Sequence, residues 1–131
     1  GGFVEATNGF FRVNGNLNLS RSIGDLKYKQ SANLRPEDQI ITAEPDVLKH
    51  TLDPKDEFFI VACDGVWDVL SNQEAVDFVR TRIQAERSNG REPQLSKICE
   101  AVFDRCIATN PRETRGIGGD NMTCVVVEIP R

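Results

Sequence analysis

Two aspartates, Asp64 and Asp120, have the residue type and position to share a metal ion. Asp64 directly follows an apolar, β-prone run at 58–63, "FFIVAC", and Asp68 comes four residues later. Asp120 stands just before a second such run at 121–129, "NMTCVVVEI". If the two runs are neighbouring antiparallel strands, the end of one lies beside the start of the other. Asp64 and Asp120 would then meet at one sheet edge, where two carboxylates need a cation or a shared proton between them.

The residues around these aspartates favour a small, hard cation. Gly65, Gly118 and Gly119 leave backbone room for an ion and its waters. Oxygen ligands without histidine or thiolate indicate Mg²⁺ or Mn²⁺ rather than zinc or copper. The alternative is structural, because aspartate is also common at the start of a turn, as at Asp64, and as a cap, as at Asp68. Spacing alone leaves both interpretations open.

The composition is that of one ordinary globular domain. The chain has 131 residues, of which 39% are hydrophobic and 27% charged, enough for a single core. With 20 acidic against 16 basic residues the net charge is −4. No basic patch is present to neutralise phosphates, which argues against nucleic acid as a partner. No apolar run approaches the roughly 18 residues of a membrane span, so no membrane association is expected.

The four cysteines do not form a metal-binding pattern. They show no CxxC spacing, and the single histidine, His50, stands apart from them. A zinc site built from cysteine and histidine is therefore not expected. Each cysteine has an apolar context, which favours a reduced, intracellular protein, located in the cytoplasm, the nucleus or both, with an extracellular location as the alternative. The four are Cys63, Cys99, Cys106 and Cys124.

The elements that must position the aspartates begin with short strands and turns. Asn8-Gly9 predicts a hairpin between strands at 2–6 and 10–17. The asparagine-glycine-asparagine stretch at 14–16 predicts a bulge or a second turn. The segments that follow are expected to form, in order, a helical turn ending at Gly24, a polar surface loop at 30–38, two short strands around Glu44-Pro45, and a strand at 58–63.

Two helices and a last strand complete the predicted fold. Ser71 and Glu74 have capping-box spacing, and Ser88-Asn89-Gly90 ends the helix that they open. A second helix starts near Pro93, and the closing run is a strand. The fold class is therefore α+β, with helices packed on a largely antiparallel sheet. The apolar stripes of the two helices are expected at Ala75, Val76, Val79 and Ile83, and at Leu95, Ile98, Cys99, Val102 and Cys106.

Four segments resemble, in order, the signature blocks of the metal-dependent type 2C serine/threonine protein phosphatases, the PPM family. They read "FFRVNGNLNLSRSIGD", "EPDV", "FFIVACDGVWDVLSNQEAVDFV" and "GGDNMTCVVVEI". Their order and spacing match from Gly1 to Ile129, and "RVNGNLNLSRSIGD" is most similar to the eukaryotic gamma-type branch. The resemblance implies an incomplete part of a two-sheet antiparallel β-sandwich flanked by helices. It also implies a binuclear metal centre at one end of that sandwich.

The resemblance assigns roles to the three aspartates. Asp64 and Asp120 match the two late aspartates that ligate the Mg²⁺ or Mn²⁺ pair, and they are the expected catalytic residues. Asp68 matches the acid that helps Asp64 to hold a third, weaker ion. In the family, a metal-bridging water attacks the phosphorus of phosphoserine or phosphothreonine in a protein substrate, without a phosphoenzyme.

The sequence departs from the family by lacking its first half. The "DGHGG" block, the early metal-ligating acid and the phosphate-binding arginine are not in it. Residues 1–131 are thus expected to be the C-terminal half of a catalytic domain, with little or no turnover alone. Uncovered apolar faces would favour a homodimer or a swapped assembly. The alternative function is a non-catalytic pseudophosphatase or phosphoprotein-binding module.

Other residues carry weaker expectations. Arg21 and Asp25 are expected in a buried polar network near the site. Residues 26–40 correspond to the family's flap beside the active site, and the alternative there is an ordinary mobile loop. Cys99 and Arg105 have the C-x5-R spacing of cysteine-dependent phosphatases. Because Cys99 lies on the apolar stripe of a predicted helix, we reject that mechanism.

Overall fold

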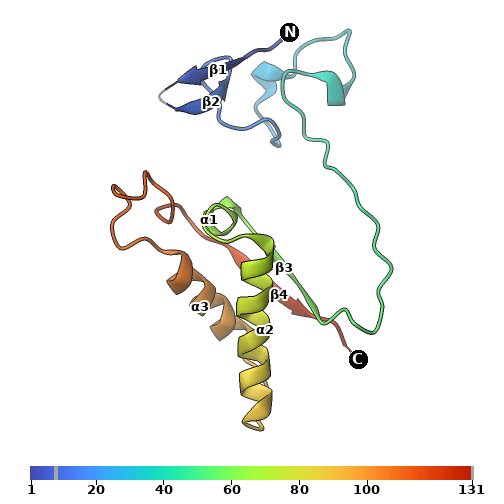
Figure 1. Ribbon diagram of the computed structural model, residues 1–131. Coiled ribbons are helices and arrows are strands. Elements are labelled where there is room, and N and C mark those ends of the chain that lie inside the picture. The colour runs from blue at the N-terminus through green and yellow to red at the C-terminus, as the bar shows by residue number, and fades with distance from the viewer. Residues whose placement is uncertain (8, 131) are drawn as a thin grey trace. The chain divides into compact units, whose positions relative to one another are not determined.

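The computed structural model describes residues 1–7 and 9–130, which divide into two compact units at 1–51 and 52–131 (Figure 1). Strands pair only within a unit, as two separate antiparallel ribbons, which confirms the α+β class. Within the described residues, no helix has both the length and the apolar character to cross a membrane. The elements are β1 (Val4–Thr7), β2 (Phe10–Val13), η1 (Leu26–Tyr28), η2 (Pro36–Asp38), β3 (Phe58–Ala62), α1 (Asp64–Trp67), α2 (Asn72–Ser88), α3 (Leu95–Cys106) and β4 (Cys124–Glu128).

The first unit opens with the predicted hairpin. Strands β1 and β2 pair antiparallel with Val4 opposite Val13. The second strand ends at Val13 rather than at Leu17, because Asn14 and Gly15 have φ angles of 50° and 70° and form the predicted turn. Asn8, in the predicted connection between the strands, lies outside the described residues.

The helical turn predicted to end at Gly24 is wrong in position. Gly24 and Asp25 have φ angles of 82° and 50°, which a right-handed helix does not accept. The turn therefore begins after them, as the 3-10 helix η1. Its Tyr28, together with Ile41, forms the small buried part of this unit.

The two strands predicted around Glu44-Pro45 are not formed. This stretch has no regular secondary structure, apart from an isolated bridge between Arg21 and Thr42. Val47 and Leu48 are 82% and 96% exposed. A β-prone sequence forms a strand only beside a second strand, and among the described residues β1 and β2 pair with each other rather than with this stretch.

The second unit is built on the two predicted strands of the metal hypothesis. Strands β3 and β4 are antiparallel with Ala62 opposite Cys124, so the predicted pairing is confirmed. Beyond the ladder, the Cys63 N–H donates to the Thr123 carbonyl at 3.1 Å. The inner face of this ribbon packs against the helices. The outer face is apolar yet exposed, and consists of Phe59, Val61, Val125 and Val127.

Helices α2 and α3 supply most of the core. The predicted capping box is present, because the Ser71 Oγ accepts the Glu74 N–H at 3.3 Å and the Ser71 N–H donates to the Glu74 carboxylate at 2.9 Å. Helix α3 begins at Leu95, after the Gln94 cap. The buried residues of this unit come from both helices, from β4 and from the chain around α1, and are Val66, Leu70, Ala75, Val79, Ile83, Ile98, Val102, Cys106 and Val126.

Removal of the cap should destabilise the second unit by a measurable amount. The Ser71→Ala substitution is expected to lower the free energy of unfolding by about 1 kcal/mol, because an N–H of the first turn loses its acceptor. Urea unfolding followed by Trp67 fluorescence measures this change. The Ser88→Ala variant, at the other end of α2, should leave the free energy of unfolding nearly unchanged. An equal loss in both variants would contradict a specific capping role.

The same cap predicts a pH dependence of stability. Hydrogen bonds from the Ser71 hydroxyl and N–H hold the pKa of Glu74 below its ordinary value. A carboxylate with a lowered folded-state pKa stabilises the fold above its unfolded pKa, and this stabilisation is lost as the pH falls through the folded value. The stability difference between wild type and Ser71→Ala should therefore shrink on acidification, as urea titrations at neutral and acidic pH would measure. A difference independent of pH would contradict this account.

Candidate metal-binding end of the sheet

The end of β3 turns directly into the short helix α1. The structural interpretation of the sequence predicts a turn at Asp64 and a cap at Asp68, but not a helix between them. Asp64 is the first residue of α1, and its Oδ1 accepts the Gly65 N–H at 3.0 Å. Asp68 caps the other end, where its N–H donates to the Asp64 carbonyl at 2.8 Å. The two carboxylates thus lie one helical turn apart on the same side of α1.

The segment that carries Asp120 lies against the start of α1. A Cβ added at Gly65 would fall 2.2 Å from the carbonyl oxygen of Asn121, so only glycine allows this approach. Cys63 supports the same contact, with its Sγ 3.4 Å from the Asn121 oxygen. Gly65 follows Asp64, and Asn121 follows Asp120. The structure therefore brings the backbone at both predicted ligands to one end of the β3–β4 ribbon.

The side chains of these aspartates are accessible and carry no ion pair within the described part of the chain. Asp64, Asp68 and Asp120 are all exposed. Asp120 accepts a hydrogen bond from the Asn121 N–H at 2.7 Å, which leaves its second oxygen available. Across residues 1–7 and 9–130, however, no three His, Cys, Asp or Glu side chains are grouped so as to hold a metal. The donors fit a hard cation by their chemistry, but they do not form a complete site by themselves.

Packing beneath α1 fixes its place at the end of β3. The indole Nε1–H of Trp67 donates to the Ala62 carbonyl at 2.8 Å. Trp67 also packs against the buried core, and Val66 is fully buried. Trp67 therefore has a packing role beneath the end of the sheet. Because these contacts anchor both sides of Asp64, the direction of α1 is set by the core rather than by the aspartates.

The cysteines are unsuited to nucleophilic chemistry. Cys99 and Arg105 both lie within helix α3, which lacks the loop of N–H groups that a cysteine-dependent phosphatase needs. Burial raises the pKa of the Cys106 thiol. Burial first, and then the neighbouring Cys99 thiol, raises the pKa of Cys124 to about 12. At neutral pH Cys106 and Cys124 are therefore protonated and weakly nucleophilic.

In the first unit, Arg21 and Asp25 do not form the expected buried network. Arg21 pairs instead with Asp46, at 2.9 Å between Nη1 and Oδ2, and both side chains are exposed. Asp25 accepts a hydrogen bond from the Ser22 hydroxyl at 3.2 Å and is also exposed. The described residues of this unit bury too little apolar surface to enclose polar groups.

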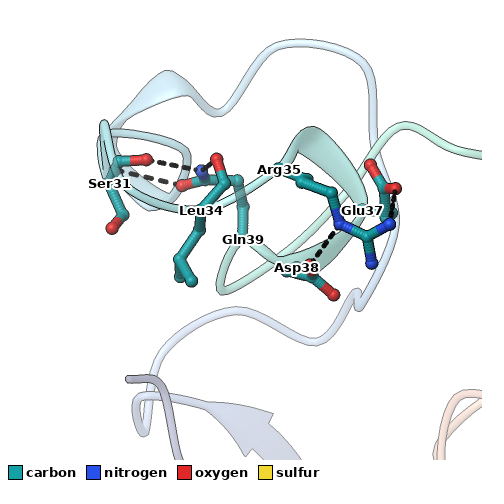
Figure 2. A network of polar contacts seen from close by, with 6 residues as sticks. All are labelled: Ser31, Leu34, Arg35, Glu37, Asp38 and Gln39. Carbon is teal, nitrogen blue, oxygen red and sulfur yellow. Dashed lines mark hydrogen bonds and ion pairs between the residues drawn. The ribbon is translucent and has the colours of Figure 1, made fainter.

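The segment that corresponds to the flap is organised by one side chain. Figure 2 shows Gln39 donating from Nε2 to the carbonyls of Ser31 at 2.8 Å and Leu34 at 3.0 Å. Its Oε1 accepts the Ser31 N–H at 3.0 Å. Arg35 pairs with Glu37 and Asp38 in the same stretch. The loop thus has defined internal contacts, which composition alone did not indicate.

Comparisons with known proteins agree with these observations. The family described as "Protein phosphatase 2C" matches residues 1–114. The chain is 54% identical over 127 residues to "Protein phosphatase 2C homolog 2" of Schizosaccharomyces pombe, covering 97% of this chain and 31% of that protein. It is 48% identical over 116 residues to "Protein phosphatase 1G" of Homo sapiens, covering 88% of this chain and 21% of that protein.

A solved phosphatase structure is similar to this chain in fold as well. The "Crystal structure of a phosphatase from a pathogenic strain Toxoplasma gondii" superposes with a TM-score of 0.67 at 28% identity, over 99% of this chain and 37% of that one. The fold described above therefore corresponds to part of that phosphatase. This chain spans about a third or less of the length of the curated relatives it was compared with above.

The close approach at Gly65 predicts a strong effect of one methyl group. The Gly65→Ala substitution should lower the free energy of unfolding by about 1–3 kcal/mol, because the added Cβ overlaps a backbone oxygen that cannot rotate away. Urea unfolding measures the loss. Gly1→Ala is the control, since nothing lies within 4 Å of its Cβ. A Gly65→Ala variant as stable as Gly1→Ala would contradict the contact with Asn121.

Proposed function

The chain belongs to the protein phosphatase 2C family, and on that premise we propose that it supplies part of the catalytic site of a metal-dependent serine/threonine protein phosphatase. One observation carries the proposal. The contact between Gly65 and the Asn121 oxygen brings together the two segments whose aspartates match the family's late metal ligands. The function of the complete protein would be hydrolysis of phosphoserine and phosphothreonine in protein substrates.

In this proposal Asp64 and Asp120 hold Mg²⁺ or Mn²⁺, and Asp68 helps to hold a further, weaker ion. When bound, the cations lower the pKa of a water and neutralise charge on the phosphoryl oxygens. The chain's own contribution is orientation. The N–H groups of Gly65 and Asn121 each bind one oxygen of the preceding aspartate, at 3.0 and 2.7 Å. Each carboxylate is thereby directed while its other oxygen stays available.

The isolated chain is proposed to be nearly inactive. Residues 1–131 act as the C-terminal half of the catalytic domain, and the remaining ligands and the phosphate-binding group come from outside this sequence. The exposure of all three aspartates and the lack, across the described residues, of a three-ligand group support this division. The same facts would also suit a non-catalytic phosphoprotein-binding module, which is the second candidate. Phosphorylated intracellular proteins are the proposed partners in both cases.

A second copy of the chain is the proposed partner of its apolar sheet face when the chain stands alone. Phe59 and Val61 are 50% and 56% exposed on the outer face of β3, opposite Val127 and Val125 of β4. Burial of this apolar surface against a second copy would stabilise the dimer by about 25 cal/mol for each Å² removed from water. The unpaired edges of a two-stranded ribbon favour the same association.

The catalytic proposal predicts which aspartates matter. In the full-length protein, Asp64→Ala and Asp120→Ala should each lower kcat/KM for a phosphothreonine peptide with Mn²⁺ at least about 100-fold, since changes even beyond the direct ligands typically cost 10–100-fold. Asp104→Ala, an exposed aspartate of α3, is the matched control. Phosphate release measures the rates. If wild type binds phosphopeptide without hydrolysing it, the non-catalytic module is the correct function.

The assembly proposal predicts a dimer of the isolated chain at high micromolar concentration. The pair Val61→Lys with Val125→Glu should shift it to monomer, because these cross-strand neighbours can then pair by charge while the face loses its apolar character. Sedimentation velocity measures the species. Gln84→Glu on the exposed side of α2 should leave the dimer intact. A wild-type monomer at this concentration would refute the proposal.

A further inference from the structure

The loop between α3 and β4, residues 107–119, is closed by its own backbone. The Ala108 N–H donates to the Gly118 carbonyl at 2.8 Å and joins the two ends. Gly118 is buried with a φ angle of 76°, and a Cβ there would lie 2.5 Å from the Cys106 carbonyl oxygen. The segment is therefore a compact Ω-loop held against the end of α3, a kind of loop that is frequently functional.

Contacts inside this loop set its shape. The Gly116 N–H donates to the Pro111 carbonyl at 2.7 Å. The Thr114 hydroxyl lies 2.5 Å from the Ile117 carbonyl oxygen. Asn110 donates from Nδ2 to the Glu113 carboxylate at 2.6 Å, so the only acidic side chain of the loop is engaged within it. Side chains on the outside of the loop are consequently presented from a defined backbone.

Two arginines on the outside of this loop have no partner. Arg112 and Arg115 are exposed. In the described part of the chain, neither guanidinium takes part in an ion pair or a hydrogen bond. Arg115 also has a φ angle of 55°, a left-handed conformation that is unfavourable for an L-residue and that glycine accepts without strain. The loop thus has an arginine at a position whose backbone conformation favours glycine.

The loop lies beside the proposed metal-binding end of the sheet. It runs into Asp120 directly after Gly119, and the next residue, Asn121, contacts Gly65 of α1; Figure 1 shows the loop between α3 and β4 in the second unit. A phosphopeptide bound at Asp120 would therefore lie beside the end of this loop. The aspartates repel an acidic peptide, whereas two uncompensated guanidinium groups attract one.

We propose that Arg112 and Arg115 bind acidic side chains flanking the phosphorylated serine or threonine, so that this protein prefers acidic phosphopeptides. The inference rests on the proposed function and adds a substrate class to it. Guanidinium groups suit carboxylates because their planar N–H fork matches the two oxygens. Since both arginines are exposed, each contributes modestly and the preference weakens as salt is added.

The test uses the full-length protein and two phosphothreonine peptides that differ only in having glutamate or glutamine beside the phosphothreonine. Wild type should favour the glutamate peptide in kcat/KM by about three- to tenfold, corresponding to two exposed ion pairs. The double variant Arg112→Gln with Arg115→Asn should bring this ratio close to one, and asparagine tolerates the left-handed conformation. Lys55→Gln removes an exposed charge before the start of β3, at the opposite end of that strand, and should keep the wild-type ratio.

The ratio separates recognition from a merely structural role. A double variant that lost activity on both peptides equally, with the ratio unchanged, would overturn the inference. A wild-type ratio of one would overturn it as well. If wild type hydrolysed neither peptide, the proposed function would fail. The Kd values of the same peptides, measured by fluorescence anisotropy, would then test the role of the two arginines. Tighter binding of the glutamate peptide that is lost in the double variant would support the arginines, and equal Kd values would overturn their role.

Discussion

The close approach of Gly65 to the Asn121 carbonyl is the contact on which the proposed site depends. Strands β3 and β4 are held in register by their ladder, so that the end of one meets the start of the other. A side chain at position 65 would hold the segments apart, and only glycine lets α1 turn against them. The backbone of the two aspartates that precede the contacting residues is thereby brought to one end of the ribbon. The metal chemistry of the family requires acids at such a place.

The uneven burial of the two units fits a chain that spans about a third or less of its relatives. The second unit has a contiguous core beneath one face of its ribbon, whereas the outer face is apolar and uncovered. In the first unit only Tyr28 and Ile41 are buried hydrophobic residues among those described. An apolar sheet face exposed to water is unfavourable. The second unit would therefore gain stability if the outer face of the β3–β4 ribbon were covered.

The charges at the proposed site are arranged in two sets with different consequences. Three exposed aspartates provide negative potential that concentrates divalent cations. The adjacent Ω-loop is fixed at its base by Ala108 and Gly118. It carries two arginine side chains, at 112 and 115, for which the described part of the chain supplies no ion pair. In the proposed function the first set binds the cations, and in the further inference the second set binds the substrate. The side chains of both sets are exposed and lie outside the buried core.

Local signals in the sequence determined the capping box at Ser71, both long helices, the first hairpin and the two strands flanked by aspartates, because these depend on neighbours along the chain. The sequence also predicted that Asp64 and Asp120 share a sheet edge, since antiparallel pairing requires it once the strands are assigned. Tertiary structure alone decided the helix α1, the contact at Gly65, the closure of the Ω-loop and the missing strands near Glu44. Some of these features depend on contacts between atoms distant in the sequence. Others depend on φ angles, as at Gly24, which the residue type allows but does not determine.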